Sequence, residues 1–143
     1  CGGFMYLTEA IIDLDGRLHP MVGLVPGISR MQPRLKSLGY RIAQTESGNF
    51  LLPKGMTARG HEFHWSSWEQ PSQAPDGENG HPAFSPQPAW YVQPRQANGG
   101  HQPNGFADGN LLGSYIHLHF AHDLQLAPNF VQACRDWRNV HGC

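Results

Sequence analysis

The stretch LLGSYIHLHF, residues 111–120, has the clearest strand pattern of the chain. Successive side chains of a strand point to opposite faces, so Tyr115, His117 and His119 share one face. The opposite face holds three apolar side chains: Ile116, Leu118 and Phe120. This alternation predicts a half-buried strand that presents two histidines, two residues apart, on the same side.

The segment after this strand predicts a helix. Pro128 suits the first helical turn, and four side chains follow it at three- and four-residue spacing. They are Phe130, Cys134, Trp137 and His141. We expect this face to pack on the protein, which makes Cys134 a core residue and not a reactive thiol.

Shorter elements precede the strand. Residues 4–10 contain no helix breaker and predict a short helix. Residues 21–25, 38–42 and 59–65 have apolar or alternating patterns that predict strands. Because the chain has 143 residues and no internal repeat, we expect one domain.

Residues 70–109 differ in composition from the rest of the chain. They contain seven of the twelve prolines and six of the seventeen glycines. Such a segment can neither continue as a helix nor fill a sheet interior. We expect a long Pro/Gly-rich insertion with one short strand at residues 89–92.

The composition argues against several classes of partner. Ten basic and eleven acidic residues leave a net charge of -1 without a Lys/Arg cluster, so we expect no nucleic acid and no membrane as partner. No stretch approaches the roughly 20 apolar residues of a membrane span. Cys1, Cys134 and Cys143 form no Cys-x-x-Cys pair, which favours reduced thiols and a cytoplasmic location.

Cys1 is the candidate nucleophile. A thiol becomes a good nucleophile at neutral pH beside a helix N-terminus or an imidazole. Gly2 and Gly3, which follow it, allow the sharp strand-to-helix turn of a nucleophile elbow. In such a turn the backbone N–H of Gly2 lies where an oxyanion needs a donor, so Gly2 is a candidate substrate-binding residue.

Six motifs resemble, in the same order, the glutaminase domain of the cobyrinic acid a,c-diamide synthases, a family of the cobalamin pathway. They are CGGFMYL (1–7), DGRLHPMVGLVPG (15–27), LGYR (38–41), ARGHEFHWS (58–66), GFADGNLLGSYIHLHFA (105–121) and FVQACRDWR (130–138). The resemblance implies an α/β fold of the class I glutamine amidotransferase type, a flavodoxin-like sheet with helices on both faces. Residues 1–143 would then be a partial domain without its N-terminal strands.

The resemblance also implies the roles of the site residues. It places the family's nucleophilic cysteine on Cys1 and its catalytic histidine on His117. The wider class I superfamily has a glutamate two residues beyond this histidine, where the chain has His119. Because a neutral imidazole supplies no negative charge, we expect a Cys-His dyad. His119 is a candidate orienting residue, although a packing or solvent-facing role is the preferred interpretation.

Other polar residues near these motifs receive weaker interpretations. His61, Glu62 and His64 suggest contact with a substrate or a metal, but strand residues satisfied by neighbouring backbone are the preferred interpretation. Asn110 and Ser114 are expected to shape a loop. No residue is assigned as a metal ligand.

The resemblance implies further partners for a full-length enzyme. Glutamine is the nitrogen donor, and an N-terminal ligase domain uses ATP and Mg²⁺ to amidate the a and c carboxylates of a corrin. No cofactor is expected in this chain itself. Because the chain starts at Cys1 and not at methionine, we expect either a processed chain or a fragment. If the resemblance holds, the strand before the elbow and the second oxyanion donor are missing, so we expect this chain alone to hydrolyse little glutamine.

Two alternatives stay open. A class II amidotransferase uses a processed N-terminal cysteine whose own α-amino group is the base, and its opening Cys-Gly pair is matched by Cys1 and Gly2. A small metal-binding β-barrel would use His117 and His119 at strand spacing, with His122 or Asp123 nearby. The barrel leaves the opening segment and the C-terminal helix unexplained.

Overall fold

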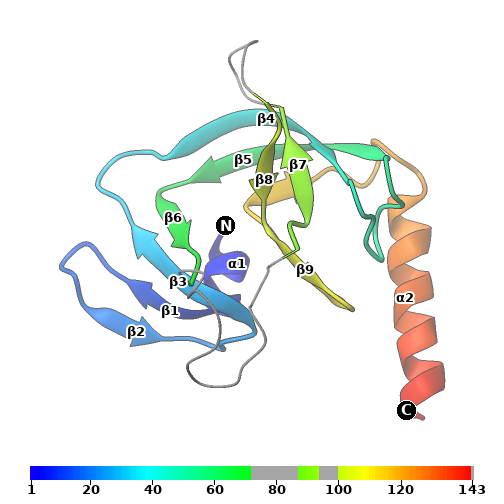
Figure 1. Cartoon of the computed structure of the whole chain (residues 1–143), viewed down its shortest axis with the longest axis horizontal. Helices are drawn as coiled ribbons and strands as arrows, with labels where there is room; N and C mark the ends of the chain where they lie inside the picture. The colour runs from blue at the N-terminus through cyan, green and yellow to red at the C-terminus, as the bar shows by residue number, and fades with distance from the viewer. Residues whose placement is uncertain (72–86, 94–99, 143) are drawn as a thin grey trace.

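A computed structural model of the chain describes residues 1–71, 87–93 and 100–142 (Figure 1). The elements in chain order are α1 (Gly2–Leu7), β1 (Thr8–Ile12), β2 (Leu18–Pro20), β3 (Val25–Met31), β4 (Ser37–Gln44), β5 (Thr57–His64), β6 (Ser66–Glu69), β7 (Trp90–Val92), β8 (Gln102–Asn104), β9 (Phe106–Asp108), β10 (Leu111–Gly113), β11 (Ile116–Leu118) and α2 (Leu126–His141). This mixture of strands and helices confirms the expected α/β class.

The strands form two main sheets. The first has the order β2-β1-β3-β6, with β1 and β3 parallel, and the second has the order β11-β5-β4-β7-β8 with antiparallel neighbours. β9 and β10 pair separately as an antiparallel hairpin. Because β5 ends at His64 and β6 begins at Ser66, a single residue, Trp65, lies between these two strands of different sheets. Figure 1 shows α1 in the middle of the molecule and α2 at one side.

An aromatic cluster holds α1 in place. The buried Phe4 ring makes edge contacts with Trp68, at a centroid distance of 5.3 Å, and with Tyr115, at 4.8 Å. Each such pair adds about 0.5–1.5 kcal/mol beyond the area that it buries. A Cβ on Gly113 would lie 2.8 Å from the Phe4 ring, so only glycine lets β10 approach this closely. The cluster therefore fixes the helix that Cys1 precedes.

A second core lies against the five-stranded sheet. Trp90, Leu52 and Leu126 are at most 1% exposed in it. Trp90 belongs to the segment 70–109, so the described part of that segment contributes to the core, and β7 confirms the strand expected at residues 89–92. Residues 72–86 and 94–99 of the same segment lie outside the described residues.

Most of the predicted elements are present with shifted boundaries. The predicted short helix is α1, which ends at Leu7 because the Thr8 hydroxyl donates to the Met5 carbonyl and β1 starts there. β4 and β5 confirm the strands expected at residues 38–42 and 59–65. The C-terminal helix is confirmed as α2.

The strand expected at residues 21–25 is wrong except at Val25, the first residue of β3. Three consecutive backbone N–H groups, from Met21 to Gly23, donate to carbonyls of Glu9, Tyr6 and Thr8. These hydrogen bonds run to α1 and β1 and do not form the regular pairing of a strand. The segment is therefore a loop that is hydrogen-bonded to α1 and β1.

Two further expectations are corrected. The single strand expected at residues 111–120 is divided into β10 and β11, because the Ser114 hydroxyl accepts the N–H of Ile116 and turns the chain between them. Cys134 is exposed and not part of the core. Leu126, at the start of α2, is the residue of that helix that is buried among those described.

Candidate active site

Cys1 and His117 meet at the start of α1. Cys1 is the N-cap residue of the helix, and its Sγ lies 3.0 Å from Nε2 of His117, although 116 residues separate the two in sequence. The thiol also donates to the backbone carbonyl of Phe63, at 2.7 Å. For the proton to reach His117, the S–H bond must turn from this carbonyl to Nε2, which accepts when Nδ1 holds the ring proton.

His117 is placed by the pairing of β11 with β5. It lies directly opposite His61, and Leu118 lies opposite Gly60. A Cβ on Gly60 would be 2.5 Å from Cγ2 of Ile116 and 2.7 Å from the carbonyl oxygen of His117. The glycine in the ARGHEFHWS motif therefore permits the close approach that brings His117 to Cys1.

The surroundings of His117 favour its neutral form. Partial burial lowers the pKa of His117, and electrostatic repulsion from the neighbouring His61 imidazole lowers it further. A base must be unprotonated to accept a proton. The site therefore keeps the imidazole ready to take the thiol proton at neutral pH.

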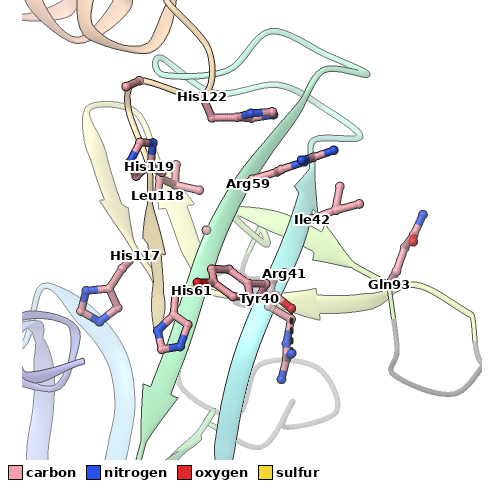
Figure 2. Close-up of a pocket in the computed structure, with 12 residues that line it drawn as sticks. Tyr40, Arg41, Ile42, Arg59, His61, Gln93, His117, Leu118, His119 and His122 are labelled. Atoms are coloured by element: carbon pink, nitrogen blue, oxygen red, sulfur yellow. Dashed lines mark hydrogen bonds between the residues drawn. The ribbon is translucent and has the colours of Figure 1, made fainter.

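Two neighbouring cavities open beside this pair. The larger, about 980 Å³, is drawn in Figure 2 and includes Tyr40, Arg59 and Gln93 in its lining, but not Cys1. The smaller, about 560 Å³, is lined by Cys1, by apolar side chains such as Met5 and Phe63, and by polar ones that include His64 and Ser66. We assign the chemistry to the smaller cavity, despite its size, because it contains the thiol. Of the lining residues, His61 and His117 belong to both cavities.

His119 occupies a different position from His117. Figure 2 shows its ring near His122, away from the His117 ring. Its backbone N–H donates to the carbonyl of Arg59, and its side chain is exposed. Among the hydrogen bonds of the described residues, none joins the His119 and His117 side chains, so an orienting role for His119 stays a prediction.

Gly2 lies in the first turn of α1, where backbone N–H groups have no partner within the helix. A Cβ on Gly2 or on Gly3 would meet nothing within 4 Å, and neither residue has a positive φ. These glycines are therefore not required by packing or backbone strain among the described residues. They leave open space next to Cys1, and the role of Gly2 as an oxyanion donor stays a prediction.

A buried polar network lies on the opposite face of β5. Glu62 accepts hydrogen bonds from Ser37, Arg41 and Asn104, and one of its oxygens lies 3.2 Å from His64 Nε2. Burial alone would raise the pKa of Glu62, but hydrogen bonds from His64 and Ser37 and the charges of His64 and Arg41 outweigh it and lower the pKa to about 2. Glu62 is therefore ionised throughout the physiological range.

His64 connects this network to α1. Its Nδ1 donates to the Ser66 carbonyl at 2.7 Å, while its Nε2 lies 3.2 Å from the Glu62 carboxylate. The ring stacks on Tyr115 with centroids 3.9 Å apart. Since Tyr115 contacts Phe4, the network supports the helix that Cys1 precedes.

The network corrects the interpretation of Glu62 and His64 and agrees with that of Ser114. Glu62 and His64 have partners, but these are mostly side chains and not neighbouring backbone. Ser114, expected to shape a loop, accepts from the N–H of Ile116 and donates to Asn104. Sequence reasoning missed the Phe63 carbonyl, which no side-chain pattern identifies. It also gave no specific role to His61, although strand alternation places that residue on the face opposite Glu62.

Neither a metal cluster nor a membrane helix is found in the part of the chain that the structure describes. No three His, Cys, Asp or Glu side chains come together there in a way that could hold a metal ion. No helix there is long and apolar enough to cross a bilayer.

Comparison with known proteins identifies similar sequences. A family model described as the CobB/CobQ-like glutamine amidotransferase domain matches residues 1–125. The chain is 41% identical over 143 residues to a cobyrinate a,c-diamide synthase of Dehalococcoides mccartyi strain CBDB1, which covers 98% of the chain and 28% of the relative. Synthases of the same name from Priestia megaterium and Thermoplasma volcanium are 36% and 34% identical, and each match covers 94% of the chain and 26% of the relative.

The chain thus spans roughly a quarter of the length of these relatives, between 26% and 28%. The comparisons give no support to an N-terminal-nucleophile amidotransferase or to a metal-binding barrel.

Proposed function

Because this chain belongs to the CobB/CobQ-like glutamine amidotransferase domain family, we propose that it is the glutaminase part of a cobyrinate a,c-diamide synthase. In this proposal Cys1 is the nucleophile and His117 is the general base and acid. The observation that supports it most directly is the 3.0 Å separation of Cys1 Sγ and His117 Nε2 beside a cavity. That distance is within the reach needed for proton transfer between a nucleophile and its base.

The first half of the reaction forms a thioester. His117 Nε2 takes the thiol proton as Sγ attacks the side-chain amide carbon of glutamine, which gives a tetrahedral intermediate with a negative oxygen. The C–N bond then breaks, and His117 returns the proton to the leaving nitrogen. Ammonia leaves and a γ-glutamyl thioester stays on Cys1.

The second half releases glutamate. His117 removes a proton from water as its oxygen attacks the thioester carbon, and the C–S bond breaks as the proton passes to the sulfur. Cys1 and His117 are restored and glutamate departs. In both halves we assign the Gly2 N–H, in the first turn of α1, as a donor to the developing oxyanion.

The function of the complete protein follows from its relatives' names. We propose that the ammonia amidates the a and c carboxylates of a corrin precursor in the cytoplasm. ATP and Mg²⁺ would activate those carboxylates. We place the nucleotide and its metal in the part of the relatives' length that this chain does not span.

The test uses the full-length protein and two matched substitutions. Cys1→Ser should abolish glutamine-dependent amidation and leave amidation from added ammonium salts at the wild-type rate, because only the source of ammonia is lost. Cys134→Ser, which changes the exposed cysteine of α2, should leave both rates unchanged. If Cys1→Ser also stops ammonia-dependent amidation, or if it keeps glutamine-dependent amidation, the proposed role of Cys1 is wrong.

A further inference from the structure

Tyr40, His61 and His117 form a row of side chains across three strands. His61 lies directly opposite His117 on β11 and directly opposite Tyr40 on β4. Side chains that face each other in this way have Cβ atoms about 4.5–5.5 Å apart and interact on the same face of the sheet. Figure 2 shows the His61 ring beside that of His117, with Tyr40 on its other side.

The row immobilises its central member. The Tyr40 and His61 rings make an edge-to-face contact with centroids 5.4 Å apart, and His61 is only partly exposed although Tyr40 is 88% exposed. His61 thus has an aromatic contact on one side and His117 on the other. Together with His117 it separates the cavity that contains Cys1 from the larger cavity.

His61 is the histidine of β5 that lies directly opposite His117. His64 of the same strand also lines the cavity that contains Cys1, but its Nε2 faces Glu62. From the N-terminal end of α1, His117 faces the thiol of Cys1. On its own strand, His119 lies two residues further along, with its ring directed elsewhere (Figure 2). Neither cavity includes an Asp or Glu among its described lining residues, and Glu62 lies on the opposite face of β5, where it is paired with Arg41.

We propose that His61 is a positioning residue that keeps His117 neutral and directed toward Cys1. The proposal rests on the function proposed above for Cys1 and His117. Two imidazoles in adjacent cross-strand positions do not both become cations readily, because like charges repel at this separation. His61 therefore opposes protonation of His117 and keeps its Nε2 available as a base.

A charge series at position 61 tests this role. A unit charge about 6 Å away, in an environment of effective dielectric constant near 40–80, changes a protonation equilibrium by roughly 0.5–1 pH unit. The acidic limb of kcat/KM for glutamine hydrolysis should therefore move in a fixed order. His61→Lys should place it at lower pH than wild type, His61→Gln at higher pH, and His61→Glu at higher pH again.

Two readouts keep the inference separate from the proposed function. The full-length protein and its variants are assayed for glutamine hydrolysis between pH 5 and pH 9, and the His117 titration is followed independently by NMR of ¹³Cε1-labelled histidine without glutamine. His122→Gln is the matched control, because His122 lines the larger cavity at a distance from Cys1. This control should move neither readout.

The outcomes are distinct. If both readouts follow the order Lys, wild type, Gln, Glu, the positioning role is supported. If the NMR titration follows this order but no protein hydrolyses glutamine, the proposed function fails while the influence of His61 on His117 stands. In a third case, glutamine hydrolysis depends on Cys1 while the acidic limb of kcat/KM and the NMR titration of His117 stay within 0.2 pH unit across the series. The role of His61 is then refuted. An equal loss of kcat in all variants, with no shift of the acidic limb of the pH profile, would likewise refute it, because a residue with a purely structural role gives that result.

Discussion

Substitution of Gly60 by alanine should damage both the fold and the site, because β11 lies against β5 at this position. The new methyl group would be 2.5 Å from Ile116 Cγ2 and 2.7 Å from the His117 carbonyl oxygen. Ordinary carbon contacts are about 3.5–4.0 Å, so β11 must retreat by roughly 1 Å. Such overpacking typically lowers the free energy of unfolding by about 1–3 kcal/mol. Because the retreating strand includes His117, the distance to Cys1 should increase as well.

The consequence for catalysis is larger than the consequence for stability. A displacement of about 1 Å between reacting groups can lower the rate about 100-fold. We expect Gly60→Ala to lose about this factor in kcat/KM for glutamine, measured in the full-length protein, and 1–3 kcal/mol in urea unfolding of this chain. Gly100→Ala is the control, because a Cβ there meets nothing within 4 Å. Equal stability and turnover in the two variants would show that β11 does not depend on the missing side chain at position 60.

Two other substitutions examine the supports of α1 and β5. Phe4→Ala should lower the free energy of unfolding by about 3–5 kcal/mol, since it removes a buried ring. It should also lower the rate of Cys1 alkylation by iodoacetamide, because a loosened α1 separates the thiol from His117. A loss below about 1 kcal/mol, measured by urea unfolding, would contradict the packing argument. Glu62→Gln should cost about 3–5 kcal/mol at neutral pH, because it leaves the half-buried Arg41 without its counter-charge. The folded pKa of Glu62, about 2, is below its ordinary value of 4.5, so its stabilisation is fully present above pH 4.5 and is lost as pH falls toward 2. Urea unfolding of wild type and Glu62→Gln at pH 7, 4 and 3 should therefore converge, and a constant difference would contradict this linkage.

Alternation and helix spacing predicted the elements whose pattern is local. β5 alternates buried and exposed residues along its length, and the sequence pattern detects it. The same reasoning brought the Cys1 and His117 motifs to attention, but only the motif resemblance connected two residues 116 positions apart. The 3.0 Å contact between them is a tertiary property that no local pattern contains.

The elements that were missed depend on long-range partners. β1, with the sequence TEAII, follows α1 without a breaker, so its start is visible only through the hydrogen bond from the Thr8 hydroxyl to Met5. Residues 21–24 are apolar like a strand, yet their N–H groups bond to α1 and β1. Helical spacing suggested that Cys134 is buried, but spacing cannot show which part of a helix has a surface to pack against.

The long sequence separation of Cys1 and His117 also has a kinetic meaning. Closing a chain segment of 116 residues costs conformational entropy before the contact between its ends returns any free energy. Contacts of this kind raise contact order and form only after most of the structure between them. The thiol and the imidazole should therefore meet at a late, cooperative step of folding. Until then the chain holds an ordinary cysteine, so the enhanced reactivity of Cys1 would serve as a chemical reporter of complete assembly.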